Sequence, residues 1–207
     1  MADSIVFVSH TSELNGAELM LLELGAQLDK EKFLKILVVP QEGPLLREAC
    51  QAGFETQIIP QKWWLTSGRK KWRQPLNWLW NLKGVLSLAG LINKRSVQVV
   101  VSNTSATFLG ALAARITKKP HFWIIHELLL HPQPVVEFFL GNRLLIKIIG
   151  RLSSRVIVNS GITGEAFPAS IPVVTILNGL NWSRLNRETK RLYLPEFLNF
   201  LEKIVQR

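Results

Sequence analysis

The sequence predicts a doubly wound α/β fold, with a mostly parallel seven-stranded sheet and helices on both faces. Seven short runs rich in β-branched residues recur along the 207 residues, and longer segments with helical periodicity separate them. The runs are continuously apolar rather than alternating, as expected for strands that helices cover on both sides. Almost every gap is long enough for the crossover helix that parallel strands require.

The predicted strands follow these apolar runs in chain order. They are Ile5–Val8, Ile36–Val39, Thr56–Ile59, Val97–Val101, His121–Ile125, Arg155–Val158 and Val173–Leu177. The helices are expected in the segments between them, where apolar residues recur at three and four positions. They are Ala17–Leu28, Pro44–Ala52, Leu76–Asn93, Ser105–Thr117, Pro134–Ser153 and a short turn near Thr163. Ligands of such folds bind beyond the carboxyl ends of the strands.

Composition places the chain among globular proteins that do not span a membrane. A hydrophobic content of 47% excludes a disordered chain, and the single cysteine, Cys50, excludes an internal disulfide. No basic segment precedes the first apolar run, so we expect no secretory signal. No stretch of about 18 residues is both apolar and uncharged. We therefore expect a cytoplasmic protein that at most lies on the inner face of a membrane.

Positive charge is concentrated in Thr56–Gly164, which carries 15 Lys or Arg and two acids. Within it, residues 62–83 combine six cations with five of the seven tryptophans and no acid. Tryptophan beside Lys or Arg suits a membrane interface with anionic headgroups. The alternative, a single-stranded nucleic-acid surface, is the weaker interpretation because indole rings are typical of lipid interfaces; we expect no nucleic-acid partner.

The tryptophans divide into two groups by position. Trp78 and neighbouring leucines have helical spacing, which predicts that part of the cluster belongs to the core face of Leu76–Asn93. Trp63, Trp64 and Trp72 precede Pro75 and are the candidates for insertion into a membrane or for contact with an acceptor. With the adjacent cations, this predicted surface comprises Trp63, Trp64, Arg69, Lys70, Lys71, Trp72 and Arg73.

Polar or glycine-containing signals follow five of the predicted strands. Gly16, after the first strand, can bring backbone close to an anion at a helix N-terminus, or can simply make a tight turn. The Ser102–Ser105 segment has the residues of an ordinary N-cap. His126 can donate to a sugar hydroxyl or a phosphate, or can be a structural histidine. The three histidines at intervals of five present no common face, so no metal site is predicted.

In its order of motifs the chain resembles the N-terminal domain of family 4 glycosyltransferases of the GT-B type. Three segments carry the resemblance, which covers about residues 4–182. They are VFVSHTSELNGAELMLLEL, VVVSNTSATFLGALAARITKKPHFWIIHE and RVIVNSGITGEAFPASIPVVTILNGLN. The Gly-Ala-Glu after the first strand, the His-Glu after the fifth and the Ile-Leu-Asn-Gly-Leu-Asn near the end are its most specific parts.

This resemblance implies an acceptor-side Rossmann-like domain and transfer of a sugar from a nucleotide-sugar to a hydroxyl, with retention of configuration. The nucleotide-sugar would be a co-substrate, and no metal or other cofactor is implied. His126 would contact the reacting sugar as the catalytic residue, and Gly16 would line the cleft. The remaining candidate substrate- or donor-binding residues at the strand ends are His10, Asn15, Asn103, Glu127, Ser160 and Asn178.

The sequence departs from the family pattern after the GT-B half. We expect residues 1–182 to form that half and residues 183–207 a helical tail, without a donor-binding domain. The chain should then be inactive alone and need a separate Rossmann-type donor subunit, with an anionic membrane or a lipid-linked acceptor as further partner. The alternative is a non-catalytic, membrane-peripheral binding or scaffold domain derived from a truncated transferase.

Overall fold

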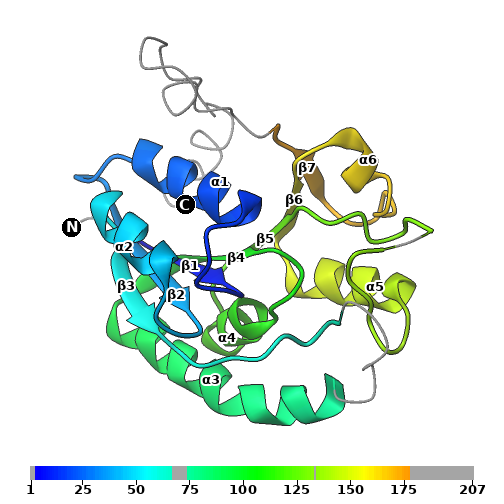
Figure 1. The fold of residues 1–207 in the computed structure, drawn as a ribbon, viewed down its shortest axis with the longest axis horizontal. Coiled ribbons are helices and arrows are strands. Elements are labelled where there is room, and N and C mark those ends of the chain that lie inside the picture. Colours follow the sequence, from blue (N-terminus) through cyan, green and yellow to red (C-terminus); the bar gives the residue numbers. More distant parts are fainter. Residues whose placement is uncertain (1–2, 67–73, 133, 178–207) are drawn as a thin grey trace.

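The computed structural model describes residues 3–66, 74–132 and 134–177 (Figure 1). Seven strands among them form one sheet in the order β3-β2-β1-β4-β5-β6-β7, and all neighbouring strands pair in parallel. The strands are β1 (Asp3–Ser9), β2 (Phe33–Val39), β3 (Glu55–Ile58), β4 (Val97–Asn103), β5 (His121–Ile125), β6 (Arg155–Val158) and β7 (Val173–Thr175). All seven predicted strands are confirmed, as is the doubly wound α/β fold.

Helices cover both faces of the sheet. They are α1 (Gly16–Gln27), α2 (Pro44–Gln51), α3 (Gln74–Lys94), α4 (Leu109–Thr117), α5 (Asn142–Leu152) and the short α6 (Gly161–Gly164). Alternate residues of β1 enter two apolar cores: Ile5 and Phe7 pack with α1 and α2, whereas Val6 and Val8 pack with α3, α4 and α5. This double covering explains why the strand runs are continuously apolar.

The strand order reverses between β1 and β4, because β2 and β3 extend to one side of β1 and the later strands to the other. The crossovers diverge at this point, which leaves a crevice at the carboxyl edge of a parallel sheet. The loops that follow β1, β4 and β5 therefore frame the expected ligand site.

The predicted helix Pro134–Ser153 is wrong over its first eight residues, since α5 begins at Asn142. Glu137 forms an antiparallel bridge with Thr66, and Gly141 has a φ of +87°. The side chain of Asn142 accepts from the backbone N–H of Phe138 and donates to the backbone oxygens of Leu129 and Val136. These tertiary bonds replace the helical ones that the apolar periodicity predicts.

The predicted helix Ser105–Thr117 also begins late, at Leu109. Thr104 has a φ of +76°, which turns the chain out of β4. The oxygen of Ser105 then accepts a hydrogen bond from the indole Nε1 of Trp64 at 2.6 Å, and the Thr107 hydroxyl donates to Gln61. The segment between β4 and α4 is therefore tied to the loop after β3.

Trp64 lies at the centre of an aromatic cluster, and the prediction that it inserts into a membrane is wrong. Its side chain is 3% exposed, and its ring contacts those of Trp78, Phe108, Trp123 and Phe138 at centroid distances of 5.2–6.1 Å. Trp78 is half-buried in the same cluster, which confirms its structural role. Arg69, Lys70, Lys71, Trp72 and Arg73 lie outside the described residues.

The helix α3 buries a different face from the one that leucine spacing predicts. Its core side includes Asn81, Val85, Leu88 and Ile92, which are buried, while Leu79 and its neighbours with the same spacing are exposed. Asn81 is held inside by two bonds to the backbone of Lys62, one donated and one accepted. No helix of the described segments is long and apolar enough to cross a bilayer.

Candidate functional site

A cluster of polar side chains occupies the carboxyl edge of the sheet where the strand order reverses. It contains residues from the ends of β1, β4 and β5 and from the first turn of α1, which together we call the polar cluster. Its members are Ser9, His10, Glu18, Asn103, Thr104, His126 and Glu127. These strands are neighbours in the sheet, so their parallel pairing brings residues far apart in the sequence together.

Asn103 connects His126 to the start of α1. Its Nδ2 donates to the backbone oxygen of Ala17 at 3.1 Å, so its Oδ1 faces the Nε2 of His126 at 3.0 Å as the acceptor. His126 must then carry its proton on Nε2. Burial lowers the pKa of His126 to about 4, so the ring is neutral near pH 7 and its Nδ1 is an unprotonated acceptor.

Glu18 supports the same arrangement from beneath. The side chain is fully buried, and its Oε1 accepts from the Ser9 hydroxyl at 3.1 Å and lies 3.5 Å from Asn103 Nδ2. Burial raises the pKa of this carboxyl, while the hydrogen bond from Ser9 opposes that shift. Its Oε2 has no hydrogen-bond partner within the described part of the chain.

His10 forms the outer part of the cluster. Its Nδ1 is 3.0 Å from the Thr104 hydroxyl and 3.5 Å from Glu18, and its ring lies 4.9 Å from that of Trp63. Trp63 also donates from Nε1 to the backbone oxygen of His10 at 3.2 Å. Burial, and secondly the proximity of His126, lower the pKa of His10 to about 4. Both site histidines are therefore neutral near pH 7.

Glu127 joins two of the loops that frame the site. Its carboxylate accepts from the backbone N–H of Ser105 at 3.2 and 3.3 Å and from that of His126 at 3.2 Å. Burial raises its pKa, and these backbone donors oppose the shift. Its hydrogen bonds hold the loops after β4 and β5 together, so it orients His126.

Gly16 stands at the open N-terminus of α1. A Cβ atom placed there would meet nothing within 4 Å, and the residue does not have a positive φ. Neither packing nor backbone conformation therefore requires glycine at this position. Asn15, the N-cap residue, makes no side-chain capping bond. A helix start with open space beside Gly16 suits an anionic or hydroxylated ligand.

Ser160, another predicted site residue, is not a member of the polar cluster. Ser160 follows β6 and caps α6, accepting from the backbone N–H of Thr163 at 3.2 Å. This is an N-capping role at the same edge of the sheet. Asn178 and the predicted tail 183–207 lie outside the described residues. Among the residues that are described, no group of His, Cys, Asp or Glu has a geometry that could hold a metal ion.

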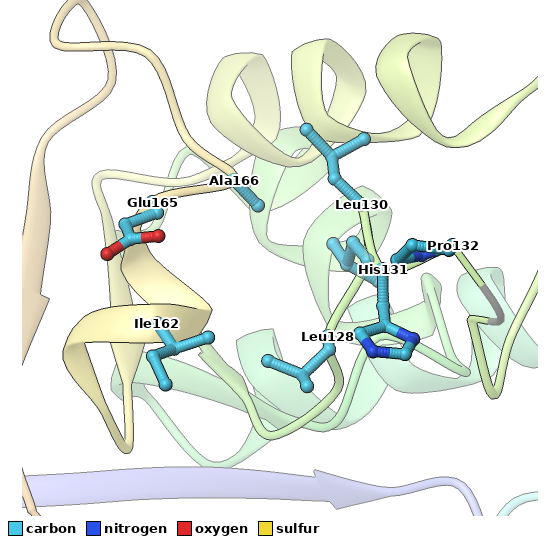
Figure 2. Close-up of a pocket in the computed structure, with 8 residues that line it drawn as sticks. Leu128, Leu130, His131, Pro132, Ile162, Glu165 and Ala166 are labelled. Atoms are coloured by element: carbon cyan, nitrogen blue, oxygen red, sulfur yellow. The ribbon is translucent and has the colours of Figure 1, made fainter.

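A pocket of about 310 Å³ opens beside the cluster, beyond the ends of β5 and β6 (Figure 2). The loop directly after Glu127 lines one side with Leu128–Pro132, and Ile162, Glu165 and Ala166 line the other. Figure 2 shows Leu128 and Ile162 pointing toward one another from these two segments. The pocket is mainly apolar. Its first lining residue, Leu128, directly follows Glu127 of the polar cluster in the sequence.

Four predicted residues are brought together by the structure, namely His10, Asn103, His126 and Glu127. Sequence reasoning missed Glu18, Ser9 and Thr104. Glu18 stands within the Gly-Ala-Glu motif, and a carboxyl three residues after the N-cap is a recognisable helix-start signal. Its burial against Ser9 depends on the packing of α1 over β4 and could not be read from the sequence. Thr104 carries no sequence signal beyond its place after a strand.

Comparisons with known proteins identify the family and the fold. A family model described as Glycosyltransferase Family 4 matches residues 14–195. Among solved structures, HepE of Anabaena in complex with UDP and glucose superposes with a TM-score of 0.61 at 18% identity, over 85% of this chain and 44% of that one. No curated protein sequence gives a significant match.

Two further structures show the same fold. A glycosyltransferase of Rickettsia africae has a TM-score of 0.62 at 17% identity and covers 98% of this chain and 49% of its own. MurG of Acinetobacter baumannii has a TM-score of 0.58 at 18% identity, with 91% and 49% covered. This chain therefore spans about half the length of the structures that it matches.

Proposed function

The chain belongs to glycosyltransferase family 4, with a fold like one half of the GT-B enzymes, and we propose that it is the acceptor-side half of a retaining glycosyltransferase. The reaction would move a sugar from a nucleotide-sugar to a hydroxyl acceptor that is lipid-linked or belongs to the cell envelope. The nucleotide-sugar is the co-substrate, and no metal or other cofactor is proposed.

The observation that carries this proposal is the neutral His126 beside the open start of α1. Its Nε2 proton is bonded to Asn103 Oδ1, which leaves Nδ1 as the acceptor for a hydroxyl of the reacting sugar. The start of α1, where Gly16 leaves open space, would meet negative charge that develops on a leaving diphosphate. Dipoles fixed in advance by Asn103 and Glu127 need little reorganisation during the reaction.

The cleft needs a second wall, because the polar cluster lies at one edge of a single sheet. The HepE structure is a complex with UDP and glucose, and this chain matches 44% of the HepE chain. We propose that a second Rossmann-type domain binds the nucleotide-sugar opposite the polar cluster. The 207 residues by themselves are then expected to be inactive, because water reaches an open half-site.

The apolar pocket beside the polar cluster supports an acceptor with an apolar part. Leu128 and Ile162 would contact that part while its hydroxyl reaches toward His126. The basic and tryptophan-rich composition of the chain supports a peripheral position at the cytoplasmic face of an anionic membrane. Both features fit a lipid-linked acceptor.

Sugar transfer in a complemented assay tests this function. The purified chain, with and without an extract that supplies the donor-binding half, is incubated with labelled nucleotide-sugars and membrane lipids. We expect no transfer by the chain alone, transfer after complementation, and a loss of at least about tenfold with His126→Ala, equivalent to 1.4 kcal/mol of barrier. Circular dichroism checks that the variant is folded.

Two results would contradict the proposal. Transfer by the chain alone at the complemented rate would show that the half-site is complete, and full activity of His126→Ala would remove the histidine from the reaction. The second candidate function is a non-catalytic, membrane-peripheral binding or scaffold domain, which the exposed leucines of α3 and the absence of acids between Glu55 and Glu127 favour. Vesicle binding without transfer under any complementation would support that candidate.

A further inference from the structure

The outer side of α3 is apolar although it faces solvent. Leu79 and Leu86 are 68% and 66% exposed, and the other members of this side are between 46% and 60% exposed. We call it the α3 outer face; its members are Leu76, Leu79, Trp80, Leu82 and Leu86. Their spacing of three and four residues places them on one side of the helix, opposite Val85 and Leu88.

A helix that is apolar on all sides is normally buried. The inner side of α3 packs in the core, so the outer face is left over once the fold is complete. Five large apolar side chains gathered on one helix differ from the scattered surface leucines of ordinary domains and mark an interaction surface. The face ends at Leu86. The exposed residues of α3 beyond it are Ser87, Gly90, Asn93 and Lys94, none of which has a large apolar side chain.

Charge identifies the kind of partner. The chain has no Asp or Glu between Glu55 and Glu127. Every charged side chain in the sequence of α3 and of the loop before it is therefore positive. Lys83 lies within the α3 outer face by its helical position, and the Lys62 Nζ lies over the Trp80 ring at 4.8 Å. Leucine and indole flanked by lysines, without acids, match the chemistry of a bilayer interface with anionic headgroups.

The α3 outer face is continuous with the polar cluster. Trp63, 43% exposed, accepts at its backbone oxygen from the Asn77 side chain of α3 at 2.8 Å. The same residue donates to His10 and packs on its ring. Because α3 leads into β4 of a parallel sheet, its first half lies toward the carboxyl edge, where the site is (Figure 1). A surface docked on α3 would therefore lie next to the mouth of the site.

We propose that the α3 outer face inserts into the headgroup layer of a membrane containing anionic phospholipid and presents the membrane surface to the polar cluster past Trp63. This deepens the membrane association of the proposed function, on which it rests, and assigns it to α3. A lipid-linked acceptor would then approach His126 from the bilayer without leaving it. The donor-binding domain is not the occupant, because it must face the sheet edge.

Vesicle flotation with single glutamate variants tests the proposal. The full chain is mixed with vesicles of phosphatidylcholine alone or with phosphatidylglycerol, at low and high salt. We expect binding to anionic vesicles that salt weakens, and a fall of at least about tenfold in the partition coefficient for Leu79→Glu. Ile116→Glu, at the end of α4 and 56% exposed in the wild type, is the matched control and should bind normally.

Each other outcome overturns the proposal. Unchanged binding of Leu79→Glu places the docking surface elsewhere, and equal binding to neutral vesicles removes the role of charge. No binding by the wild type, with a dimer in light scattering that Leu79→Glu abolishes, makes a second copy the occupant. Transfer to a detergent-dispersed acceptor in the complemented assay should persist in Leu79→Glu. If the proposed function is wrong, the wild type will show no transfer in the complemented assay. The vesicle assay does not depend on transfer and still tests the α3 outer face.

Discussion

At the scale of single residues, Asn103 determines how His126 is used. An amide has a fixed donor side and a fixed acceptor side, and the bond to Ala17 uses the donor side. His126 must therefore give its Nε2 proton to Asn103 and keep Nδ1 as an acceptor. Glu127 holds the loop that carries His126 through backbone N–H groups, and so the ring is oriented by two residues from different strands.

Replacing Gly16 by alanine distinguishes a role in ligand binding from a role in folding. A methyl group meets nothing within 4 Å, so stability should stay the same or rise by up to about 1 kcal/mol, the helix preference of alanine over glycine. The methyl group occupies the space proposed for the leaving diphosphate, and we expect KM for the nucleotide-sugar to rise at least about fivefold in the complemented assay. Thermal unfolding and initial rates measure the two effects.

Gly90→Ala is the matched control, because a Cβ atom at this position in α3 also meets nothing within 4 Å. It should share the small gain in stability without the rise in KM. Equal kinetics for Gly16→Ala and the wild type would show that no ligand approaches the start of α1.

At the scale of elements, the loop between β3 and α3 is part of the core and of the site together. Trp64 extends from it into the aromatic cluster, while Trp63, the residue before it, lies over His10. Asn81 of α3 fixes the loop by bonding to both backbone groups of Lys62. Adjacent tryptophans of one basic segment thus have opposite environments.

Alanine substitutions at these two tryptophans should differ in their effect on folding. Trp64→Ala removes a buried indole from the cluster, and we expect a loss of roughly 3–5 kcal/mol of unfolding free energy. Trp63→Ala removes a half-exposed ring and one hydrogen bond, and a loss of about 1 kcal/mol is expected. Urea unfolding curves followed by circular dichroism measure both, and similar losses would contradict the assignment of Trp64 to the core.

At the scale of the whole molecule, buried histidines make stability depend on pH. His121 lies between β4 and α5, with Nδ1 3.0 Å from the oxygen of Leu152 and Nε2 2.9 Å from the Ser102 hydroxyl. Burial lowers its pKa from 6.5 to about 4, and the bond to Leu152 partly opposes this shift. The unfolded chain therefore binds more protons than the folded one between these values, so stability falls as pH falls.

The expected contribution of His121 is about 2 kcal/mol between pH 7 and pH 5, since each unit of pKa corresponds to 1.4 kcal/mol. The raised pKa values of Glu18 and Glu127 act in the opposite direction, because the folded state retains their protons. Comparison with His121→Gln isolates the histidine: the variant is less stable at pH 7 but should lose less on acidification. If the melting temperatures of the wild type and His121→Gln fall equally as the pH falls, His121 is not the cause of the pH dependence.

The sequence by itself determined the strands and their parallel pairing, because apolar runs with helix-length gaps leave few other arrangements. The order of its motifs carried the resemblance to the family. Parallel strands place their carboxyl ends at one edge, so the sequence also identified four members of the polar cluster: His10, Asn103, His126 and Glu127. The tertiary structure decided what the local pattern leaves open. Leucines and tryptophans occur on all sides of α3 and in the loop before it, so their spacing does not tell which of them are buried. Packing against Phe108 and Phe138 decides this. The late starts of α4 and α5 likewise depend on contacts between segments distant in the sequence, Trp64 with Ser105 and Thr66 with Glu137. The burial of Glu18 depends on the packing of α1 against β4.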